Sequence, residues 1–577
     1  MSRGTLPRVA FVFAAASAAL AAPTPVTVTL ACGAARGLVE PLADGSGAVA
    51  AFRGVPYAAR PERWAAPAAA PCWGGTLDAS AFGPACVQPD GATGDEDCLS
   101  VSAYVPLLAN GSLPGPGARL PVFFYIHGGS LMSGSGNYET PQVLAVRTNA
   151  VVLTINYRLN IHGFLASASL AAEQGGRCGN YGILDQQLAL RWAQANAPLL
   201  GGDASRVTLG GQSSGGTSIF ALLSSPASRG LFSAAVAWSG SPNMSMPLAT
   251  ALAQNAPVVN ATGCARPPSG WRDELACLRA LPLKALAAAI PSGYNTPGIF
   301  GLDTLNPGGF GSLYAGLAII DGAVLTQPFA DAFASGLVDV PVVMGGLGQE
   351  CELGPDNHVR GMDLPQWRAF LNSTLRQWTE PARSQLLEAL YDSFLADAEL
   401  DAQRAYDSIN AAYGTACAFA HIGARSKRAE EGGARTSPVY VYRTNWQPSV
   451  PLSSGDSKWN LTWSFHTWDY RAALEAWPLP ADPAAAFPGP TDLALARFQQ
   501  GVLSQIFRTG RLDPAATQGW DSIERVPDFA SGGYGVMRIS SGDLPPFEPL
   551  LFEDRGLEAV CAMLDRFGFD ERFWWVN

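Results

Sequence analysis

Short runs rich in β-branched and aromatic residues alternate along the chain with longer runs in which apolar residues recur at helical spacing. The strand-like runs are residues 121–129, 149–159, 205–211, 339–346 and 438–446. The helix-like runs are residues 185–197, 365–378 and 493–507. Continuous apolar runs of the first kind are typical of strands buried on both faces. The alternation predicts an α/β fold with a mostly parallel central sheet, helices on both faces and helical insertions in the middle and C-terminal thirds.

A serine framed by glycines lies where one of these strands gives way to a helix. The stretch VTLGGQSSGG, residues 207–216, places Ser213 between Gly211 and Gly215. A flexible Gly/Ser-rich turn is one interpretation. At a strand-to-helix junction, however, glycines on both sides permit a sharp turn that exposes the serine hydroxyl as a nucleophile. The following helix also directs its first N–H groups toward a developing oxyanion, so the context favours a nucleophilic Ser213.

A second glycine-rich loop, His127-Gly128-Gly129-Ser130, ends the strand-like run 121–129. Two glycines after a strand also occur in ordinary turns. A loop with bare backbone N–H groups is nevertheless the other half that an oxyanion hole requires. We therefore expect the N–H groups of Gly129, Ser130 and Ser214 to stabilise an oxyanion.

Long stretches around both loops resemble the type-B carboxylesterase/lipase family of α/β-hydrolases, which also holds cholinesterases and non-catalytic neuroligin-like adhesion proteins. They are FRGVPYAARPERW (52–64), EDCLSVSAYVP (96–106), PVFFYIHGGS (121–130), NYRLNIHGFLA (156–166), residues 179–216 and WSGSPN (238–243). The resemblance is nearly continuous from about residue 50 to 245 and thins beyond. It implies one α/β-hydrolase domain over residues 23–577 that cleaves carboxylic esters through an acyl-enzyme, without metal or organic cofactor.

A serine nucleophile needs a base, and the family order of serine, acid and histidine leaves three candidates: His358, His421 and His466. In the family the catalytic histidine is followed three residues later by an acidic residue, and Asp469 gives His466 that spacing. His421 lies in a helical pattern, where a packed or surface role is more common. His358 lies in a polar loop and stays an alternative.

The acid is expected just after the strand-like run 339–346, because open α/β sheets bind ligands at the carboxyl ends of their strands. The resemblance favours Glu350, since Gly345 and Glu350 keep the family spacing of glycine and acid. Glu352 and Asp356 are rivals, although isolated acids are usually solvated surface groups.

The chain departs from the family pattern beside several of these residues. Ser130 stands where the family has a third glycine, which narrows the acyl entrance. Gln212 replaces the usual acidic neighbour of the nucleophile and removes a charge that would attract cationic substrates. Ser214 replaces an alanine, a change that a backbone donor tolerates. Gln212 and Ser239, in WSGSPN, are expected to support the catalytic residues.

The N-terminus predicts a secreted protein. Arg3 and Arg8 precede an apolar run over residues 9–19 and a small-residue cleavage site, a pattern typical of a signal peptide over residues 1–22. No later run reaches about 18 uninterrupted apolar residues, the length of a membrane span. The chain has 577 residues with 37 basic and 48 acidic side chains, and it lacks a basic cluster that would bind nucleic acid.

Ten cysteines agree with an oxidising, extracellular compartment. Sequons for N-glycosylation lie at Asn110, Asn243, Asn260, Asn372 and Asn460. The resemblance implies the disulfides Cys86–Cys98, Cys264–Cys277 and Cys417–Cys561, and the simplest pairing of the remainder is Cys32–Cys72 and Cys178–Cys351.

The loop between Cys86 and Cys98, VQPDGATGDED, is short, acidic and free of aromatic residues. In lipases of this family it is a long apolar lid, and in cholinesterases it carries an aromatic cation-binding residue. The sequence therefore favours a secreted carboxylesterase that acts on a small-molecule ester. A lipase that acts on longer-chain acylglycerols is the alternative, and a non-catalytic adhesion or binding protein is the remote one.

Overall fold

A computed structural model describes most of the chain between residues 23 and 515. The described residues are 23–242, 244–266, 270–292, 294, 317–350, 359–377, 380–381, 383–385, 387–388, 402–411, 414–415, 417–453, 460–515, 536–539 and 547–550. Several expectations fall on residues outside this set. They are the signal peptide (1–22), Asn243, Cys351, Glu352, Asp356, His358 and Cys561.

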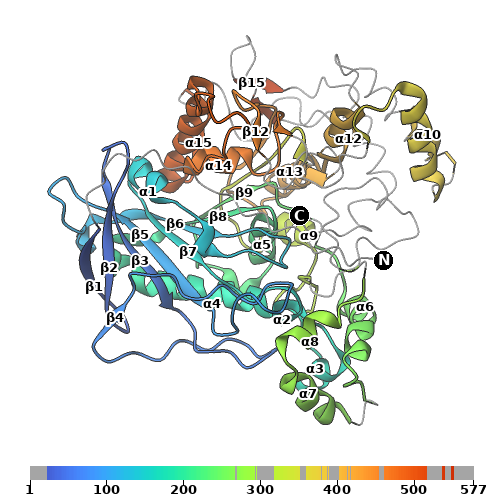
Figure 1. Cartoon of the computed structure of the whole chain (residues 1–577), viewed down its shortest axis with the longest axis horizontal. Helices are drawn as coiled ribbons and strands as arrows, with labels where there is room; N and C mark the ends of the chain where they lie inside the picture. The colour runs from blue at the N-terminus through green and yellow to red at the C-terminus, as the bar shows by residue number, and fades with distance from the viewer. Residues whose placement is uncertain are drawn as a thin grey trace.

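Thirteen strands of the described residues form one twisted sheet (Figure 1). The N-terminal strands are β1 (Thr24–Leu30), β2 (Gly33–Pro41), β3 (Ala48–Pro56), β4 (Thr76–Asp78) and β5 (Ser100–Pro106). The others are β6 (Leu120–Ile126), β7 (Val151–Ile155), β8 (Gly202–Gln212), β9 (Ala234–Trp238), β10 (Val342–Leu347), β11 (Val439–Thr444), β14 (Val536–Ile539) and β15 (Phe547–Leu550). Their order is β1-β2-β3-β5-β7-β6-β8-β9-β10-β11-β14-β15, with β4 beside β2.

The strand directions divide this sheet into a parallel centre and antiparallel ends. Every neighbouring pair from β7 through β14 is parallel, which confirms the predicted central sheet. The pairs β1·β2, β2·β3, β3·β5 and β5·β7 are antiparallel, as is β14·β15. Because the central strands all run the same way, the residues that follow β6, β8, β9, β10 and β11 gather at one edge of the sheet.

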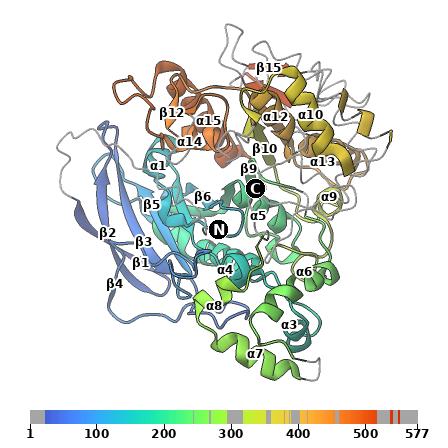
Figure 2. The same ribbon diagram turned by 45° about the vertical axis from the view of Figure 1, so that its right-hand side comes forward.

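Helices cover both faces of the parallel centre, as predicted. One face carries α1 (Gln142–Thr148), α14 (Trp468–Leu474) and α15 (Pro490–Thr509), which lie together in Figure 1 and Figure 2. The other face carries α4 (Tyr181–Asn196) and α5 (Ser214–Leu223). Strand β6 is apolar at nearly every position because helices cover both of its faces and all its side chains are buried. Phe124 packs in the core of the second face, whereas Phe123 lies 5.1 Å from the ring of Phe507 on α15.

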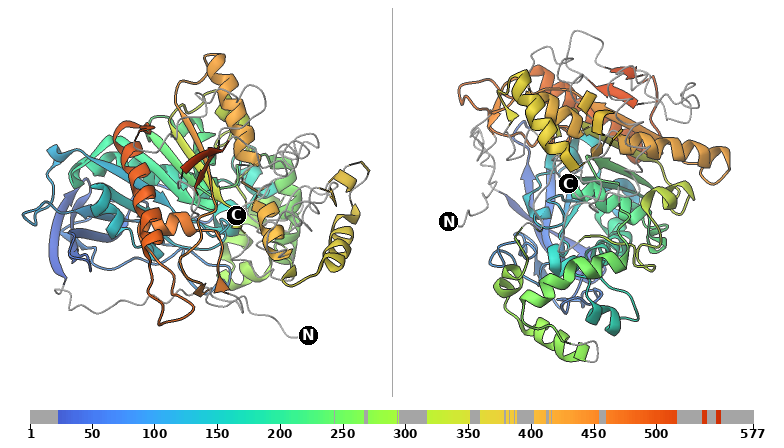
Figure 3. Two further views of the ribbon diagram at one scale, coloured as in Figure 1. Left: turned by 90° about the horizontal axis from the view of Figure 1, so that it is seen from above. Right: turned by 90° about the vertical axis from the view of Figure 1, so that its right-hand side faces the viewer.

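Helical insertions follow β9 and β10. The first group is α6 (Leu248–Ala261), α7 (Trp271–Ala280), α8 (Leu283–Ala288) and α9 (Phe329–Ala334), and the second is α10 (Leu364–Thr374), α12 (Ala402–Ala411) and α13 (Cys417–Glu431). The right-hand view of Figure 3 places α6, α7 and α8 at the opposite end of the molecule from α10 and α13. Among the described residues, no helix is both long enough and apolar enough to cross a membrane.

The cysteines pair largely as expected. The structure contains Cys32–Cys72, Cys86–Cys98 and Cys264–Cys277. Cys417 is disulfide-bonded, but its expected partner Cys561 lies outside the described residues.

The expected pair Cys178–Cys351 is wrong, because Cys178 is a free and buried thiol. Its Sγ points into the core and donates a weak hydrogen bond to the carbonyl of Ser167, 3.7 Å away. Burial raises the pKa of this thiol to about 11, so it stays protonated and unreactive.

Candidate active site

Ser213 occupies the turn between β8 and α5. Its backbone has φ 59° and ψ −129°, a region that non-glycine residues adopt only when the surrounding structure holds them there. The amide of Ser213 donates to the carbonyl of Trp238 at the end of β9, with an N···O distance of 2.8 Å. This bond fixes the turn to the neighbouring strand and places the serine at the carboxyl edge of the sheet.

The flanking glycines are required by direct backbone contacts. A Cβ on Gly211 would lie 2.4 Å from the carbonyl oxygen of Gly215, and a Cβ on Gly215 would lie 2.1 Å from that of Ile126. A Cβ on Gly216 would lie 2.9 Å from the Cα of Gly240. Any larger residue would push apart the strand, the turn or the helix, so the glycines permit the close packing that a sharp turn needs.

Glu350 and His466 form a buried pair although they lie far apart in the sequence. His466 Nδ1 is 2.5 Å from Glu350 Oε2, and the Glu350 side chain is completely buried. The other carboxylate oxygen, Oε1, accepts hydrogen bonds from Ser239 Oγ and from the amide of Leu347, each at 2.7 Å. These donors compensate for the burial of the carboxylate. Ser239, expected to support the site, therefore contacts the acid directly.

A short parallel bridge aligns the segments that carry this pair. Gln349 pairs with Phe465, and the amide of Gln349 donates to the carbonyl of Ser464 at 3.0 Å. The Gln349 side-chain oxygen in turn accepts from the amide of Ser464 at 3.3 Å. The next residue on each segment is Glu350 or His466, so the bridge sets the two side chains opposite each other.

The loop after β6, in which the oxyanion donors Gly129 and Ser130 were expected, has a run of three residues with positive φ. Gly129 has φ 112°, and Ser130 and Leu131 have φ 58° and 56°. A Cβ on Gly129 would lie 2.2 Å from the carbonyl oxygen of Ser133, so this position requires glycine. The amide of Leu131 donates to Ser214 Oγ at 2.9 Å, which ties the loop to the first turn of α5. This tie could not be predicted from the sequence, which pointed only to the backbone of Ser214.

Gln212, the residue before Ser213, contacts the imidazole. Gln212 Nε2 lies 3.0 Å from His466 Nε2, the ring nitrogen opposite the one that meets Glu350. Within the described residues, no hydrogen bond joins Ser213 Oγ to His466. The side-chain amide of Gln212 is therefore the hydrogen-bond partner of Nε2.

Asp469 lies beneath the histidine and is completely buried. Its Oδ2 accepts from the hydroxyl of Tyr442 at 2.5 Å, and its Oδ1 accepts from the amide of Tyr470 at 2.7 Å. Burial raises the pKa of Asp469, the Tyr442 hydrogen bond lowers it, and the negative charge of Glu350 raises it further, to about 7. The sequence spacing drew attention to Asp469, but nothing in the sequence singled out Tyr442.

His421, one of the three histidines that could have supplied the base, lies elsewhere. It is on α13, where its Nε2 accepts from Arg425 Nε at 2.8 Å. It lines a small pocket together with Met244 and Phe329. The third histidine, His358, and the rival acids Glu352 and Asp356 fall outside the described residues.

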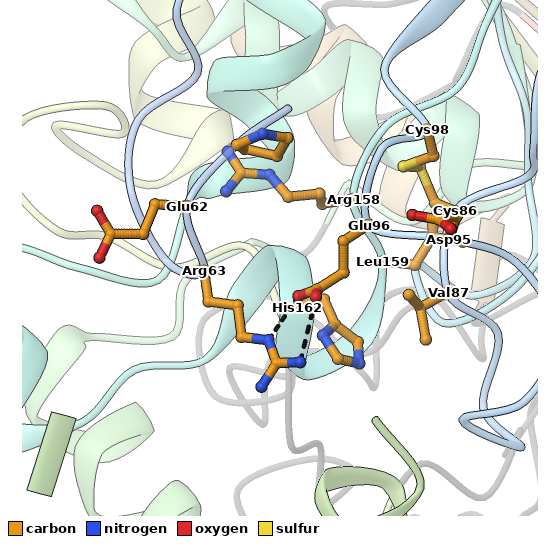
Figure 4. Close-up of a pocket in the computed structure, with 11 residues that line it drawn as sticks. Glu62, Arg63, Cys86, Val87, Asp95, Glu96, Cys98, Arg158, Leu159 and His162 are labelled. Atoms are coloured by element: carbon orange, nitrogen blue, oxygen red, sulfur yellow. Dashed lines mark hydrogen bonds and ion pairs between the residues drawn. A yellow bond between two sulfur atoms is a disulfide. The ribbon is translucent and has the colours of Figure 1, made fainter. Parts of the chain in front are cut away.

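A second, small pocket lies beside the Cys86–Cys98 disulfide (Figure 4). Its walls are charged and include the ion pair of Arg63 and Glu96, with an N···O distance of 2.6 Å. His162 also lines it, but Ser213, Glu350 and His466 do not. No group of metal-ligating side chains occurs in the described part of the chain.

Comparison with known proteins identifies the family to which the chain belongs. A sequence profile of the carboxylesterase family matches residues 24–493, most of the chain. The chain belongs to the carboxylesterase family. A carboxylesterase of Geobacillus stearothermophilus has a similar fold, with a TM-score of 0.67 and 23% sequence identity, over 92% of this chain and 99% of that one.

Curated relatives of this carboxylesterase-family chain include esterases and neuroligins. Fumonisin B1 esterase of Sphingopyxis macrogoltabida is 33% identical over 53% of this chain and 54% of its own length. Para-nitrobenzyl esterase of Bacillus subtilis is 38% identical over 33% of this chain and 40% of its own. Neuroligin-3 of Mus musculus is 36% identical over 38% of this chain and 31% of its own length. The chain thus covers about half or less of the length of each of these relatives.

The raised pKa of Asp469 predicts a pH-dependent stability. Because its pKa of about 7 in the folded protein exceeds its ordinary 3.8, its contribution to stability is present below about pH 4 and is lost as the pH rises through 7. The free energy of unfolding of the wild type, relative to Asp469→Asn, should fall by on the order of 4 kcal/mol between pH 4 and pH 8. Urea titrations followed by tryptophan fluorescence measure this difference, and a difference that does not change with pH contradicts it.

Asp203→Asn is a control with the opposite sign. Burial raises the pKa of Asp203, but hydrogen bonds from Ser205, Arg119 and Arg206 outweigh it and hold the pKa well below its ordinary value. The stability that Asp203 contributes is therefore present above about pH 4 and is lost as the solution becomes more acidic. Between pH 4 and pH 8 the difference in stability between the wild type and Asp203→Asn should therefore stay constant, and below about pH 4 the wild type should lose stability relative to the variant.

Proposed function

We propose that this family member is a serine carboxylic-ester hydrolase in which Ser213, His466 and Glu350 form the catalytic triad. The observation that carries the proposal is the buried contact of His466 Nδ1 with Glu350 Oε2, next to a serine held in a strained turn. The carboxylate orients the imidazole and leaves its Nε2 as the proton acceptor, which is the function of the acid in such triads.

The proposed reaction proceeds through an acyl-enzyme. His466 takes the proton of Ser213 as the serine oxygen attacks the ester carbonyl, and the N–H groups of Gly129, Ser130 and Ser214 stabilise the tetrahedral oxyanion. Each such donor contributes about 3 kcal/mol in comparable sites. His466 then gives the proton to the departing alcohol, and water repeats the sequence on the acyl-enzyme.

The loop closed by Cys86 and Cys98 favours an esterase over a lid-gated lipase. Gln88 at its start is bonded twice to Gly134 in the segment that follows the oxyanion loop: its amide nitrogen donates to the carbonyl, and its oxygen accepts from the amide, each at 3.0 Å. At its tip, a Cβ on Gly91 would lie 2.8 Å from the carbonyl oxygen of Leu283 on α8. A loop bonded at one end and packed against a helix at its tip is poorly suited to opening as a lid.

The remote alternative is a non-catalytic adhesion protein, since neuroligins are among the relatives. The buried acid–histidine pair favours catalysis. A buried carboxylate that orients an imidazole is the arrangement that a serine hydrolase needs for its base.

Secretion is also part of the proposal. The leader-like residues 1–22, the disulfides and the sequons all suit an oxidising compartment. The side chains of the described sequon asparagines are exposed, as glycosylation requires: Asn110, Asn260, Asn372 and Asn460. In this proposal, residues 23–577 form one α/β-hydrolase domain that binds a small-molecule ester.

Secretion predicts a processed and glycosylated product. When the full chain is expressed in a eukaryotic host, we expect it in the medium with an N-terminus near Ala22 or Pro23. Treatment with an N-glycosidase should lower its mass, and peptide mass spectrometry should place glycans on the exposed sequons. A protein that stays inside the cell, keeps residues 1–22 and carries no glycan contradicts this part of the proposal.

The reaction predicts hydrolysis of p-nitrophenyl esters, tested from acetate to palmitate. We expect the highest kcat/KM on short acyl chains and no rise in rate when a long-chain substrate passes its solubility limit, because the Cys86–Cys98 loop cannot open as a lid. Ser213→Ala should lower kcat by about 10⁶-fold, the scale of the loss when the nucleophile of another serine hydrolase is removed.

A matched control for this series is Ser224→Ala. Ser224 is a buried serine at the end of α5, where its hydroxyl donates to the carbonyl of Phe220 at 2.8 Å. Its substitution should leave the activity within about twofold, because it contacts no catalytic group. Equal turnover by Ser213→Ala would overturn the triad, whereas a maximum on long chains with interfacial activation would favour the lipase alternative.

A further inference from the structure

The side-chain amide of Gln212 spans the space between the oxyanion loop and the histidine. Its Nε2 lies 3.0 Å from His466 Nε2. Its Oε1 faces the other way, at 3.3 Å from the position that a Cβ on Gly128 would occupy. Gln212 is the last residue of β8 and is 5% exposed, so both ends of the amide are held in a closed space.

This placement decides which form of His466 the amide favours. His466 Nδ1 faces the Glu350 carboxylate, which only accepts hydrogen bonds, so Nδ1 carries a proton. In the neutral ring, Nε2 then has a free lone pair. An amide N–H that donates into that lone pair stabilises the neutral ring, and it cannot form the same bond once Nε2 is protonated.

We propose that Gln212 is a positioning residue whose side-chain amide favours the neutral, proton-accepting form of His466. The inference rests on the proposed function of the same site. In the structure the amide faces the lone pair of Nε2, and in the proposed reaction the Ser213 hydroxyl takes its place. The proton of Ser213 then moves to Nε2 and later to the departing alcohol. Since Gln212 has no charge, it does not hold the protonated ring in the resting enzyme as a carboxylate would.

The other charged and titratable groups around His466 come from three further elements. Glu350 follows β10, Asp469 lies on α14, and Tyr442 on β11 donates to Asp469 at 2.5 Å. Substitutions of Gln212 leave all three in place. A change in the pH dependence of such variants therefore reports on the amide at position 212.

The test is the pH profile of kcat/KM between pH 4 and pH 9, measured by pH-stat on a short-chain ester whose alcohol does not titrate. Gln212→Leu removes the donor, and the midpoint of the acid limb should move to higher pH by several tenths of a unit. Gln212→Glu adds a charge that favours the protonated ring, and its midpoint should move up by about 1 pH unit or more.

Two contrary profiles would overturn the inference. An acid limb that stays in place in both variants means that the amide does not act on the base. A limb that moves to lower pH in Gln212→Leu means that the amide oxygen, rather than the nitrogen, faces His466. If Gln212→Leu does not fold, Gln212→Asn takes its place, because it keeps the amide but is one methylene too short to reach Nε2. The midpoint of its acid limb should also move to higher pH.

Gln186→Leu is the matched control. Gln186 is a buried glutamine on α4 whose Nε2 donates to Ser218 Oγ at 3.0 Å, away from the histidine. Its loss should leave the acid limb where it is in the wild type, and an equal shift in this variant would overturn the inference. Failure of the proposed function looks different, because the wild type would then hydrolyse no ester or Ser213→Ala would remain active.

Discussion

The candidate site depends on a backbone constraint at Ser213. The serine holds φ 59° because no side chain stands at Gly211 or Gly215, where a Cβ would meet backbone oxygens at 2.4 and 2.1 Å. Close packing of β8, the turn and α5 brings the serine to the carboxyl edge of the sheet. The same packing brings the first turn of α5 near the loop after β6, to which the Ser214 hydroxyl is bonded. The proposed nucleophile and oxyanion donors therefore share one rigid support.

The acid and the base arrive at this edge by a different route. They come from segments after β10 and β11 that meet through the bridge of Gln349 and Phe465. The bridge lies one residue before Glu350 and one residue before His466, so the pairing of the two segments brings these two side chains together. Burial then makes each partner of the pair necessary to the other, because an unpaired carboxylate at the position of Glu350 would be costly. Gln212 completes the surroundings of the imidazole from the side of the nucleophile.

Local patterns in the sequence were enough to predict the parallel centre of the sheet and its helices, because buried strands such as β6 are apolar throughout. They were not enough for β2 and β3, whose many small residues give little alternation. Ser213 could be identified from its glycines, and Glu350 and His466 from a family resemblance. The contact of Gln212 with His466 joins residues 254 positions apart, and only the folded chain reveals it. The free thiol of Cys178 was missed for the same reason, since pairing depends on geometry.

Covalent labelling with a phosphonate ester tests the central claim most directly, because such a reagent reacts with the oxygen of an activated serine. After proteolysis, mass spectrometry identifies the modified residue. We expect one adduct per chain, on the peptide that contains Ser213, and a reaction at least about 100-fold slower in His466→Gln. An adduct on another serine, or an equally fast reaction without the histidine, would contradict the account.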